Sequence, residues 1–127
     1  MKLSLISEKR ATTVAIDLDG TLAVELDKHD PNKIGKPIYN ARQILKKLKG
    51  LGIIIIINTC RNNKKLIKDW LQEHDIPYDY INKNPQQPKN TSYKIMADRY
   101  WDNRQPSWPG LQYAYEELER FIKSSHK

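Results

Sequence analysis

The chain alternates between short runs of branched apolar residues and longer segments in which apolar residues recur every three or four positions. The first pattern is typical of buried strands and the second of amphipathic helices. The clearest run is Ile53–Ile57, five consecutive isoleucines without polar alternation. Such a run predicts a strand covered on both faces, as in a parallel sheet between layers of helices. A shorter β-branched run, Thr12–Ile16, predicts a second buried strand that ends at an acidic pair.

The remaining segments complete an alternating order of strands and helices. Three helices are expected: one from Ile38 to Gly50 or Gly52, one that begins after a cap at Asn62 or Asn63, and one from Leu111 to Ile122. Two further strands are expected at Ile76–Asn82 and Ile95–Asn103. This order predicts a three-layer, Rossmann-like α/β fold with a central parallel sheet flanked by helices. At 127 residues, the chain is expected to form one domain over residues 1–127.

The charge balance favours an anionic partner. Lysine and arginine number 22 against 15 aspartates and glutamates, which gives a net charge of +7. Phosphate esters, nucleic acid and acidic proteins all stay open on this ground. No zinc finger, RNP-like aromatic motif or dense basic stripe singles out nucleic acid. Charge alone therefore does not define the partner.

The single cysteine and the short apolar runs indicate the compartment. Because Cys60 is the only cysteine, an internal disulfide and a thiolate zinc site are excluded. We expect Cys60 to be a small buried apolar side chain rather than a nucleophile. The apolar stretch within residues 1–10 is too short for a secretory signal, and Ile53–Ile57 is too short to span a membrane. We expect a soluble cytoplasmic protein without a membrane partner, and assembly into a homo-oligomer stays open.

Polar side chains follow three of the predicted strands. Asp17 and Asp19 come directly after the first strand, and residues 58–61, with the sequence Asn-Thr-Cys-Arg, come after the isoleucine run. Asp102 and Asn103 come at the end of the fourth strand. In parallel α/β sheets, ligands bind outside the carboxyl ends of the strands. We therefore expect these side chains to meet at one edge of the sheet.

The acidic pair after the first strand suggests a metal site. Asp17 and Asp19 are two positions apart, so their side chains point to the same side of an extended segment. A divalent cation would remove their mutual repulsion, and Mg²⁺ commonly takes one or two carboxylates together with water or phosphate oxygens. Gly20 permits a tight turn, the Thr21 hydroxyl can hold that turn, and Asp102 would supply a further ligand.

The same groups match the requirements of phosphoryl transfer, which needs a nucleophile, a proton donor for the leaving group and donors for the equatorial oxygens. Asp17 can be the nucleophile, Asp19 the proton donor, and Thr59 with a lysine can hold the phosphoryl group. Each interpretation has a structural alternative. Asp-x-Asp-Gly can form a simple turn, Thr59 can end a strand or cap a helix, and Arg61 can be a substrate contact or a surface residue.

Several of these motifs resemble those of a known family. "DLDGT", at Asp17–Thr21, is similar to the DxDGT signature of the haloacid-dehalogenase-like phosphatases. Further blocks resemble, in the same order, those of small capless bacterial and phage members. They are "IGKPI" (34–38), "NTCR" (58–61), "INKNP" (81–85) and "YKIMADRYWDNR" (93–104). The resemblance extends from about Val14 to about Trp108 and implies a capless hydrolase of phosphate monoesters that uses Mg²⁺.

The resemblance also implies a role for each matching residue. In the family, the first aspartate of the signature is phosphorylated, and the second is the general acid/base and binds Mg²⁺ through its main-chain carbonyl. The later motifs supply a hydroxyl, a lysine and a metal-binding acid. Carried over, the catalytic residues are Asp17 and Asp19, the phosphate-binding residues are Gly20, Thr21, Thr59 and Lys94, the metal-binding residues are Asp17, Asp19, Asp102 and Asn103, and Asn58 and Arg61 are candidates for contact with the substrate.

Two positions depart from the family pattern, and one assignment is a choice among neighbours. Asn103 stands where small members usually have a second aspartate, which predicts a weaker Mg²⁺ site. Asn58 stands where an aromatic residue often precedes Thr-Cys-Arg, which bears on substrate fit. Lys94 is preferred over Lys83 and Lys89 as the active-site lysine because of its place in the "KIMAD" block.

The intervals between the motifs leave no room for a cap domain. Fewer than twenty residues lie between Thr21 and Ile38, enough for a flap only, and one helix, one short strand and a loop use the interval from Thr59 to Lys94. Residues and resemblance together predict a Mg²⁺-dependent phosphomonoesterase that acts on a phosphorylated substrate through an aspartyl-phosphate. The alternatives are a phosphatase of nucleic-acid ends, a nucleic-acid-binding module and a catalytically weak scaffold.

Overall fold

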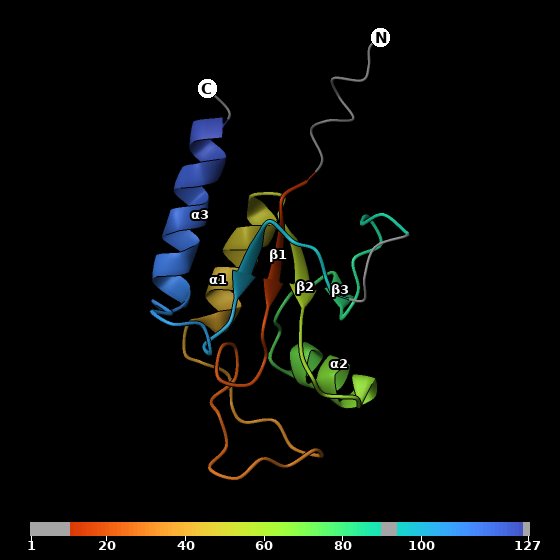
Figure 1. Ribbon diagram of the computed structural model, residues 1–127. Coiled ribbons are helices and arrows are strands. Elements are labelled where there is room, and N and C mark those ends of the chain that lie inside the picture. Colours follow the sequence, from red (N-terminus) through yellow and green to blue (C-terminus); the bar gives the residue numbers. More distant parts are fainter. Residues whose placement is uncertain (1–10, 90–93, 126–127) are drawn as a thin grey trace.

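The computed structural model describes residues 11–89 and 94–125, which form a four-stranded sheet with three helices (Figure 1). In chain order the elements are β1 (Thr13–Ile16), α1 (Ala41–Gly50), β2 (Ile54–Ile57), α2 (Lys64–Glu73), β3 (Tyr80–Ile81), β4 (Arg99–Trp101) and α3 (Leu111–Ser125). The strand order is β3-β2-β1-β4, with parallel pairing throughout. The N-terminal segment 1–10 and Tyr93, both used in the sequence analysis, lie outside the described residues.

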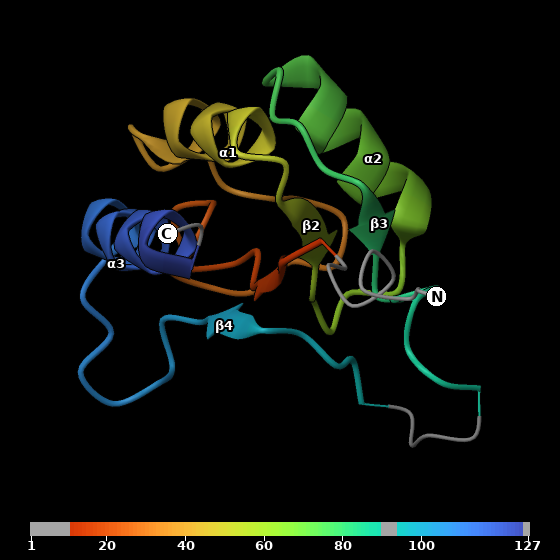
Figure 2. The ribbon, with the colours of Figure 1, turned by 90° about the horizontal axis from the view of Figure 1, so that it is seen from above.

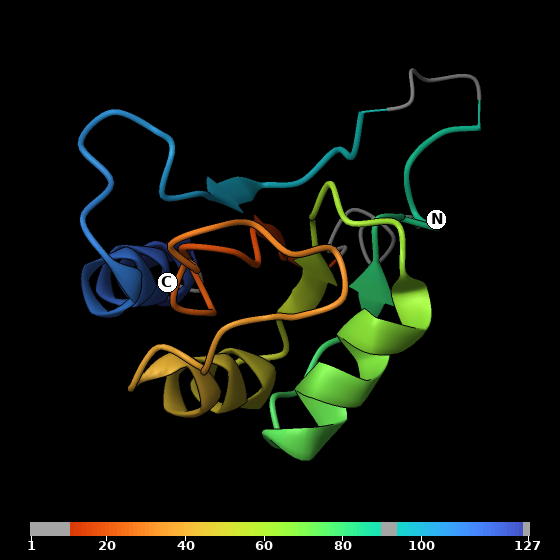
Figure 3. The ribbon, with the colours of Figure 1, turned by 90° about the horizontal axis from the view of Figure 1, so that it is seen from below.

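The predicted α/β fold with a central parallel sheet is confirmed. β1 lies inside the sheet, where Ile16 pairs in register with Ile57 of β2 and Trp101 of β4. Figures 2 and 3 show α1, α2 and α3 on the same side of the sheet. Strands β1, β2 and β3 are added in one direction, so right-handed crossovers place α1 and α2 on one face. The three-layer prediction implied a helical layer on the second face, which the described helices do not form.

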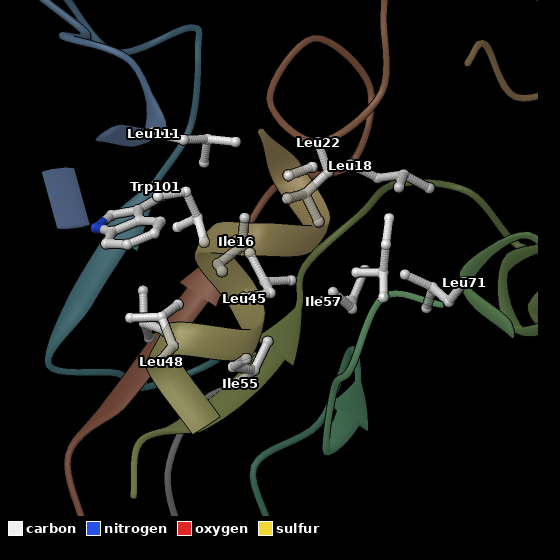
Figure 4. Close-up of a cluster of buried hydrophobic side chains, with 14 of the residues drawn as sticks. Ile16, Leu18, Leu22, Leu45, Leu48, Ile55, Ile57, Leu71, Trp101 and Leu111 are labelled. Atoms are coloured by element: carbon white, nitrogen blue, oxygen red, sulfur yellow. The ribbon is translucent and has the colours of Figure 1, made fainter. Parts of the chain in front are cut away.

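The hydrophobic core lies between the sheet and its helices (Figure 4). It combines Ile55 and Ile57 of β2 with Leu45 and Leu48 of α1, all without solvent exposure. Burial of each such side chain contributes about 1.5–3 kcal/mol to folding. Ile56 points to the opposite face of the strand and is also fully buried. Both faces of β2 thus carry buried isoleucines, as the lack of polar alternation predicted, although Ile54, at its start, is only half-buried.

The fourth strand is shorter than predicted because side chains bond the backbone in front of it. The Tyr100 hydroxyl accepts from the backbone N–H of Ala97 at 3.0 Å and donates to the carbonyl of Ile95 at 2.7 Å. The Asp98 carboxylate accepts from the backbone N–H and the hydroxyl of Thr13, at 2.8 and 3.1 Å. These bonds replace a strand ladder before β4 and tie it to the amino end of β1.

The helix ends agree with the sequence signals. The Asn63 side chain caps α2 by accepting from the backbone N–H of Leu66 at 3.0 Å. α1 ends at Gly50, one of the two glycines predicted to end it. Within residues 11–89 and 94–125, no helix has both the length and the apolar character needed to cross a membrane.

The chain between β1 and α1 forms a tight turn followed by a long loop. Residues 24–37, which we call the flap loop, extend beyond the carboxyl end of the sheet before the chain returns to α1 (Figure 1). Ala23 forms isolated bridges with Asp19 and with Pro37, which hold the two ends of the loop together. The Trp70 indole N–H of α2 donates to the carbonyl of Gly35 at 2.9 Å. The interval predicted to hold a flap thus forms a loop fixed at several points.

Candidate active site

A cavity of about 460 Å³ opens at the carboxyl end of the sheet. Its lining consists of Asp17, Asp19, Thr59, Cys60, Arg61 and Arg104 from the strand ends, and Glu25, Leu26, Asp27 and His29 from the flap loop. The structure therefore brings together Asp17, Asp19, Thr59 and Arg61, as their positions after neighbouring parallel strands predicted.

The turn after β1 directs both aspartates to the cavity. The backbone N–H of Asp17 donates to the carbonyl of Trp101 at 2.8 Å, which extends the pairing of β1 with β4. Leu18, between the two aspartates, is fully buried in the core (Figure 4). Gly20 has a φ of +89°, and its N–H donates to the carbonyl of Ala23 at 2.8 Å. Because Leu18 points into the core and the chain turns at Gly20, Asp17 and Asp19 point away from the core and into the cavity.

The Asp17 carboxyl group has a pKa raised to about 6 from its ordinary value of 3.8. Burial is the largest cause, and the negative charges of Asp102 and, to a smaller extent, Asp19 add to it. The backbone N–H of Leu18 and the positive charge of Arg104 act in the opposite direction. The Asp17 carboxylate is therefore a partly buried anion among other anions, a group that gains from a nearby cation.

Asn103 contacts the turn that carries both aspartates. With its amide nitrogen toward the turn, Asn103 donates to Asp17 Oδ2 and Thr21 Oγ1 at 3.2 Å each, and to the carbonyl of Asp19 at 3.3 Å. The reverse orientation would turn the amide oxygen toward these acceptors. A Cβ atom at Gly20 would lie 2.3 Å from the nearer atom of the Asn103 amide group, so this contact requires glycine at position 20. Asn103 thus acts here as a donor, whereas the resemblance implied a metal ligand.

The oxygen atoms around Asn103 form a suitable donor set for Mg²⁺. Asp17 Oδ2 and the Asp19 carbonyl converge on one nitrogen atom, and the Asp102 carboxylate is near enough to raise the pKa of Asp17. Two carboxylates and one carbonyl are hard ligands of the kind that Mg²⁺ takes together with water and phosphate oxygens. In the described parts of the chain, no three Asp, Glu, His or Cys side chains are grouped to hold a metal by themselves. An ion here would use the Asp19 carbonyl and would replace the Asn103 amide as the partner of Asp17.

Arg61 is buried and paired with Asp19. Its Nε and one terminal nitrogen donate to the two carboxylate oxygens of Asp19 at 2.8 and 2.9 Å. The terminal nitrogens also donate to the flap-loop carbonyls of Asp30 and Lys33 at 3.0 and 2.9 Å. The hydrogen bonds to Asp19 are the main reason that the pKa of Arg61 is raised. Arg61 lines the cavity, but it is neither a surface residue nor free to bind substrate, because its donors hold Asp19 and the flap loop.

Thr59 and Cys60 follow β2 at the cavity wall. The backbone N–H of Thr59 donates to Asn82 Oδ1 at 2.8 Å, and its hydroxyl oxygen accepts from the backbone N–H of Arg61 at 3.1 Å. α2 is capped by Asn63, so the Thr59 hydroxyl proton stays available as a donor. Cys60 is exposed, so the expectation of a buried apolar side chain was wrong. The chain leaves the sheet at this point, and Cys60 is exposed at the cavity wall.

Other predicted phosphate ligands lie elsewhere. Lys94 is exposed, and its carbonyl accepts from the Gln87 side chain at 3.1 Å; neither Lys94 nor the alternatives Lys83 and Lys89 is among the cavity-lining residues. The Thr21 side chain is buried against Asn103. Lys94, the lysine implied by the resemblance, is therefore not in the cavity that contains Asp17 and Asp19.

Asn58 is also outside the lining. Its backbone N–H donates to the carbonyl of Ile16 at 2.8 Å, so it continues the pairing of β2 with β1. The cavity wall on this side begins one residue later, at Thr59. Of the two candidates for substrate contact, only Arg61 therefore reaches the cavity, and its donors are already used.

The flap-loop wall and Arg104 were not predicted from the sequence. Glu25, Asp27 and His29 line the cavity, although the loop has no periodic pattern that would have singled them out. Arg104 comes directly after Asp102 and Asn103, and its place next to two predicted site residues was a signal that it could line the cavity.

The chain is similar to two solved structures, although no protein-family model and no curated protein match it. A conserved protein from Bacteroides thetaiotaomicron superposes with a TM-score of 0.73 at 26% identity, over 87% of this chain and 92% of that one. A crystallised target protein from Vibrio cholerae superposes with a TM-score of 0.55 at 22% identity, over 90% of this chain and 98% of that one. Both support the α/β fold, and neither description names an activity.

Proposed function

We propose that the protein is a Mg²⁺-dependent phosphomonoesterase of the haloacid-dehalogenase-like type, which acts through an aspartyl-phosphate on Asp17. The observation that carries this proposal is the pairing of two unlike carboxylates in one cavity. Asp17 is partly buried among anions and needs a cation, whereas Asp19, two residues away, is held by Arg61. This division of partners suits a nucleophile that works beside a metal ion and a separate acid/base.

The reaction has two steps. Asp17 attacks phosphorus, the bond from phosphorus to the leaving oxygen breaks, and Asp19 gives that oxygen a proton. Asp19 then takes a proton from a water molecule that attacks the aspartyl-phosphate, which releases inorganic phosphate and restores the Asp17 carboxylate. A bound Mg²⁺ would neutralise charge on the phosphoryl oxygens. The Thr59 hydroxyl, at the same wall, supports the proposal as a donor to these oxygens.

The pairing with Arg61 is compatible with proton transfer by Asp19. The guanidinium uses one lone pair on each carboxylate oxygen, and each oxygen keeps another. Asp19 can therefore exchange a proton with the leaving group or with water while it stays oriented. Arg61 acts as a positioning residue in this scheme.

The test is release of p-nitrophenol from p-nitrophenyl phosphate by the wild type and by Asp17→Asn, each with Mg²⁺ and with EDTA. We expect turnover by the wild type with Mg²⁺ only, and mass spectrometry of acid-quenched enzyme should find phosphate on the peptide that contains Asp17. Asp69→Asn is the matched control, because it removes an exposed carboxylate on α2 that does not line the cavity. Turnover retained by Asp17→Asn would contradict the proposal.

A second candidate function is binding of phosphate esters with little turnover, and Asn103 favours it. Its amide nitrogen already donates to Asp17 and to the Asp19 carbonyl, the two groups that would hold the metal. If the wild type binds inorganic phosphate but Asn103→Asp alone hydrolyses the ester, the scaffold alternative is the better description. Equal turnover by both proteins would exclude it.

A further inference from the structure

The cavity has few positive groups with which to receive a phosphate. Asp17, Asp19, Glu25 and Asp27 line it, and apart from His29 the basic side chains among its lining residues are two arginines. A phosphate monoester carries close to two negative charges near neutral pH, and its transfer requires positive groups at the oxygens. The proposed reaction therefore depends on which arginine is available.

Arg61 is not available. Its side chain is 4% exposed, and it donates to Asp19 and to the carbonyls of Asp30 and Lys33. Turning it toward a substrate would leave the partly buried Asp19 carboxylate without its two donors and break the bonds to both carbonyls, which is costly. Arg61 therefore serves Asp19 and the flap loop.

Arg104 is in a different situation. Its backbone N–H donates to Asp102 Oδ1 at 2.9 Å, and the N–H of Gln105 donates to the carbonyl of Asp102 at 3.0 Å, so a turn fixes Arg104 just beyond β4. Its exposed side chain lines the cavity, and its charge acts on Asp17. In residues 11–89 and 94–125, its guanidinium makes no hydrogen bond or ion pair.

We infer that Arg104 is the residue that binds the transferring phosphoryl group, in the place that the sequence resemblance gives to Lys94. The inference rests on the proposed function and adds a phosphate ligand to it. A guanidinium presents parallel N–H donors that match two phosphate oxygens, and this geometry gives it an advantage over a lysine. Lys94 is exposed, and it does not line the cavity. Asp102 thus has two tasks, as a candidate metal ligand and as the acceptor that fixes the backbone of Arg104.

The experiment compares Arg104→Gln, Arg104→Lys and Lys94→Gln with the wild type. Binding of inorganic phosphate is measured by calorimetry with Mg²⁺ present, and kcat/KM is measured on p-nitrophenyl phosphate. Arg104→Gln should weaken phosphate binding at least tenfold and lower kcat/KM by roughly a hundredfold. Arg104→Lys should recover part of both losses. Arg120→Gln, an exposed arginine on α3, is the matched control and should behave as the wild type.

The outcomes separate this inference from the proposed function. If the wild type hydrolyses the ester and Arg104→Gln is unchanged while Lys94→Gln fails, the inference is overturned and the proposed function stands. If the wild type binds phosphate without turnover and Arg104→Gln loses that binding, the inference stands and the proposed function fails. Absence of both binding and turnover in the wild type overturns both.

Discussion

Asp17 and Asp19 are two residues apart and line the same cavity, but their carboxylates have different partners. Asp19 receives two hydrogen bonds from the buried Arg61, whereas Asp17 lies near the negative charge of Asp102 and has a pKa raised to about 6. Sequence spacing alone treats the two aspartates alike, since both follow the same strand. The difference comes from Arg61 and Asp102, which follow β2 and β4, and it agrees with the different roles proposed above for the two aspartates.

The largest effect should follow from removing the partner of Asp19. Arg61→Met leaves the Asp19 carboxylate without its two donors and removes the bonds to the carbonyls of Asp30 and Lys33. The Asp30 carbonyl keeps another donor, the N–H of Lys33 at 3.2 Å. We expect the free energy of unfolding in urea to fall by about 2–4 kcal/mol, since breaking a buried pair costs more than breaking a surface pair. Lys65→Met, which removes the exposed pair with Asp69, should leave the free energy of unfolding nearly unchanged. Equal effects would show that Arg61 does not stabilise the site.

The turn between the two aspartates should be the next most sensitive feature. Gly20→Ala places a Cβ atom 2.3 Å from the Asn103 amide at a φ of +89°, and we expect a loss of about 2–3 kcal/mol in thermal or urea unfolding. Gly52→Ala is the matched control, because Gly52 also has a positive φ of +79° but nothing within 4 Å. It should lose only about 1 kcal/mol. The difference between the two variants measures the contact with Asn103, and similar losses would mean that Asn103 moves aside.

Removal of the Asp17 charge should stabilise the metal-free protein. Because the pKa of Asp17 is raised in the folded state, the folded protein binds the proton more tightly than the unfolded chain, and stability falls as pH rises from about 4 to about 6. Asp17→Asn removes this loss, so in EDTA at pH 7 its free energy of unfolding should exceed that of the wild type by roughly 1–2 kcal/mol, after allowance for solvent screening. The free energies of unfolding of both proteins are measured in urea at pH 4 and at pH 7. A variant less stable than the wild type at pH 7 would contradict the assigned pKa.

Asn103→Asp should sharpen the need of Asp17 for a cation. The substitution replaces the amide donor beside Asp17 with a third carboxylate near Asp102. We expect calorimetry to show that Mg²⁺ binds several-fold more tightly to Asn103→Asp than to the wild type. The increase in melting temperature on addition of Mg²⁺ should also be larger than in the wild type. Asn84→Asp, on the loop after β3, is the control and should leave Mg²⁺ binding unchanged. Unchanged Mg²⁺ affinity in Asn103→Asp would show that this amide does not compete with the metal.

Much of the fold was predictable because its elements have local signals. The isoleucine run, the apolar spacing of α1 and the cap at Asn63 all act within a few residues, and each predicted the element found there. β4 was predicted too long because its apolar pattern extends beyond its backbone pairing. The backbone in front of it is bonded by the Tyr100 hydroxyl and by Asp98, which no periodic pattern could reveal.

The site was predictable only where it follows strand ends. Asp17, Asp19 and Thr59 reach the cavity because parallel strands end at one edge. The partners of these residues depend on side chains brought together from distant segments: Arg61 lies 42 positions from Asp19. Lys94 shows the reverse case. The motif match predicted it in the site, but in the fold it does not line the cavity.

The way in which Arg61 holds the flap loop places no demand on the side chains of the residues that it contacts. Arg61 donates to the main-chain carbonyls of Asp30 and Lys33, and Trp70 donates to that of Gly35, so these attachments use no side chain of the loop. Every residue type offers a carbonyl. Glu25, Asp27 and His29, which line the cavity, can therefore be exchanged to alter its charge and shape, while Asp19 and the loop keep their common attachment to Arg61.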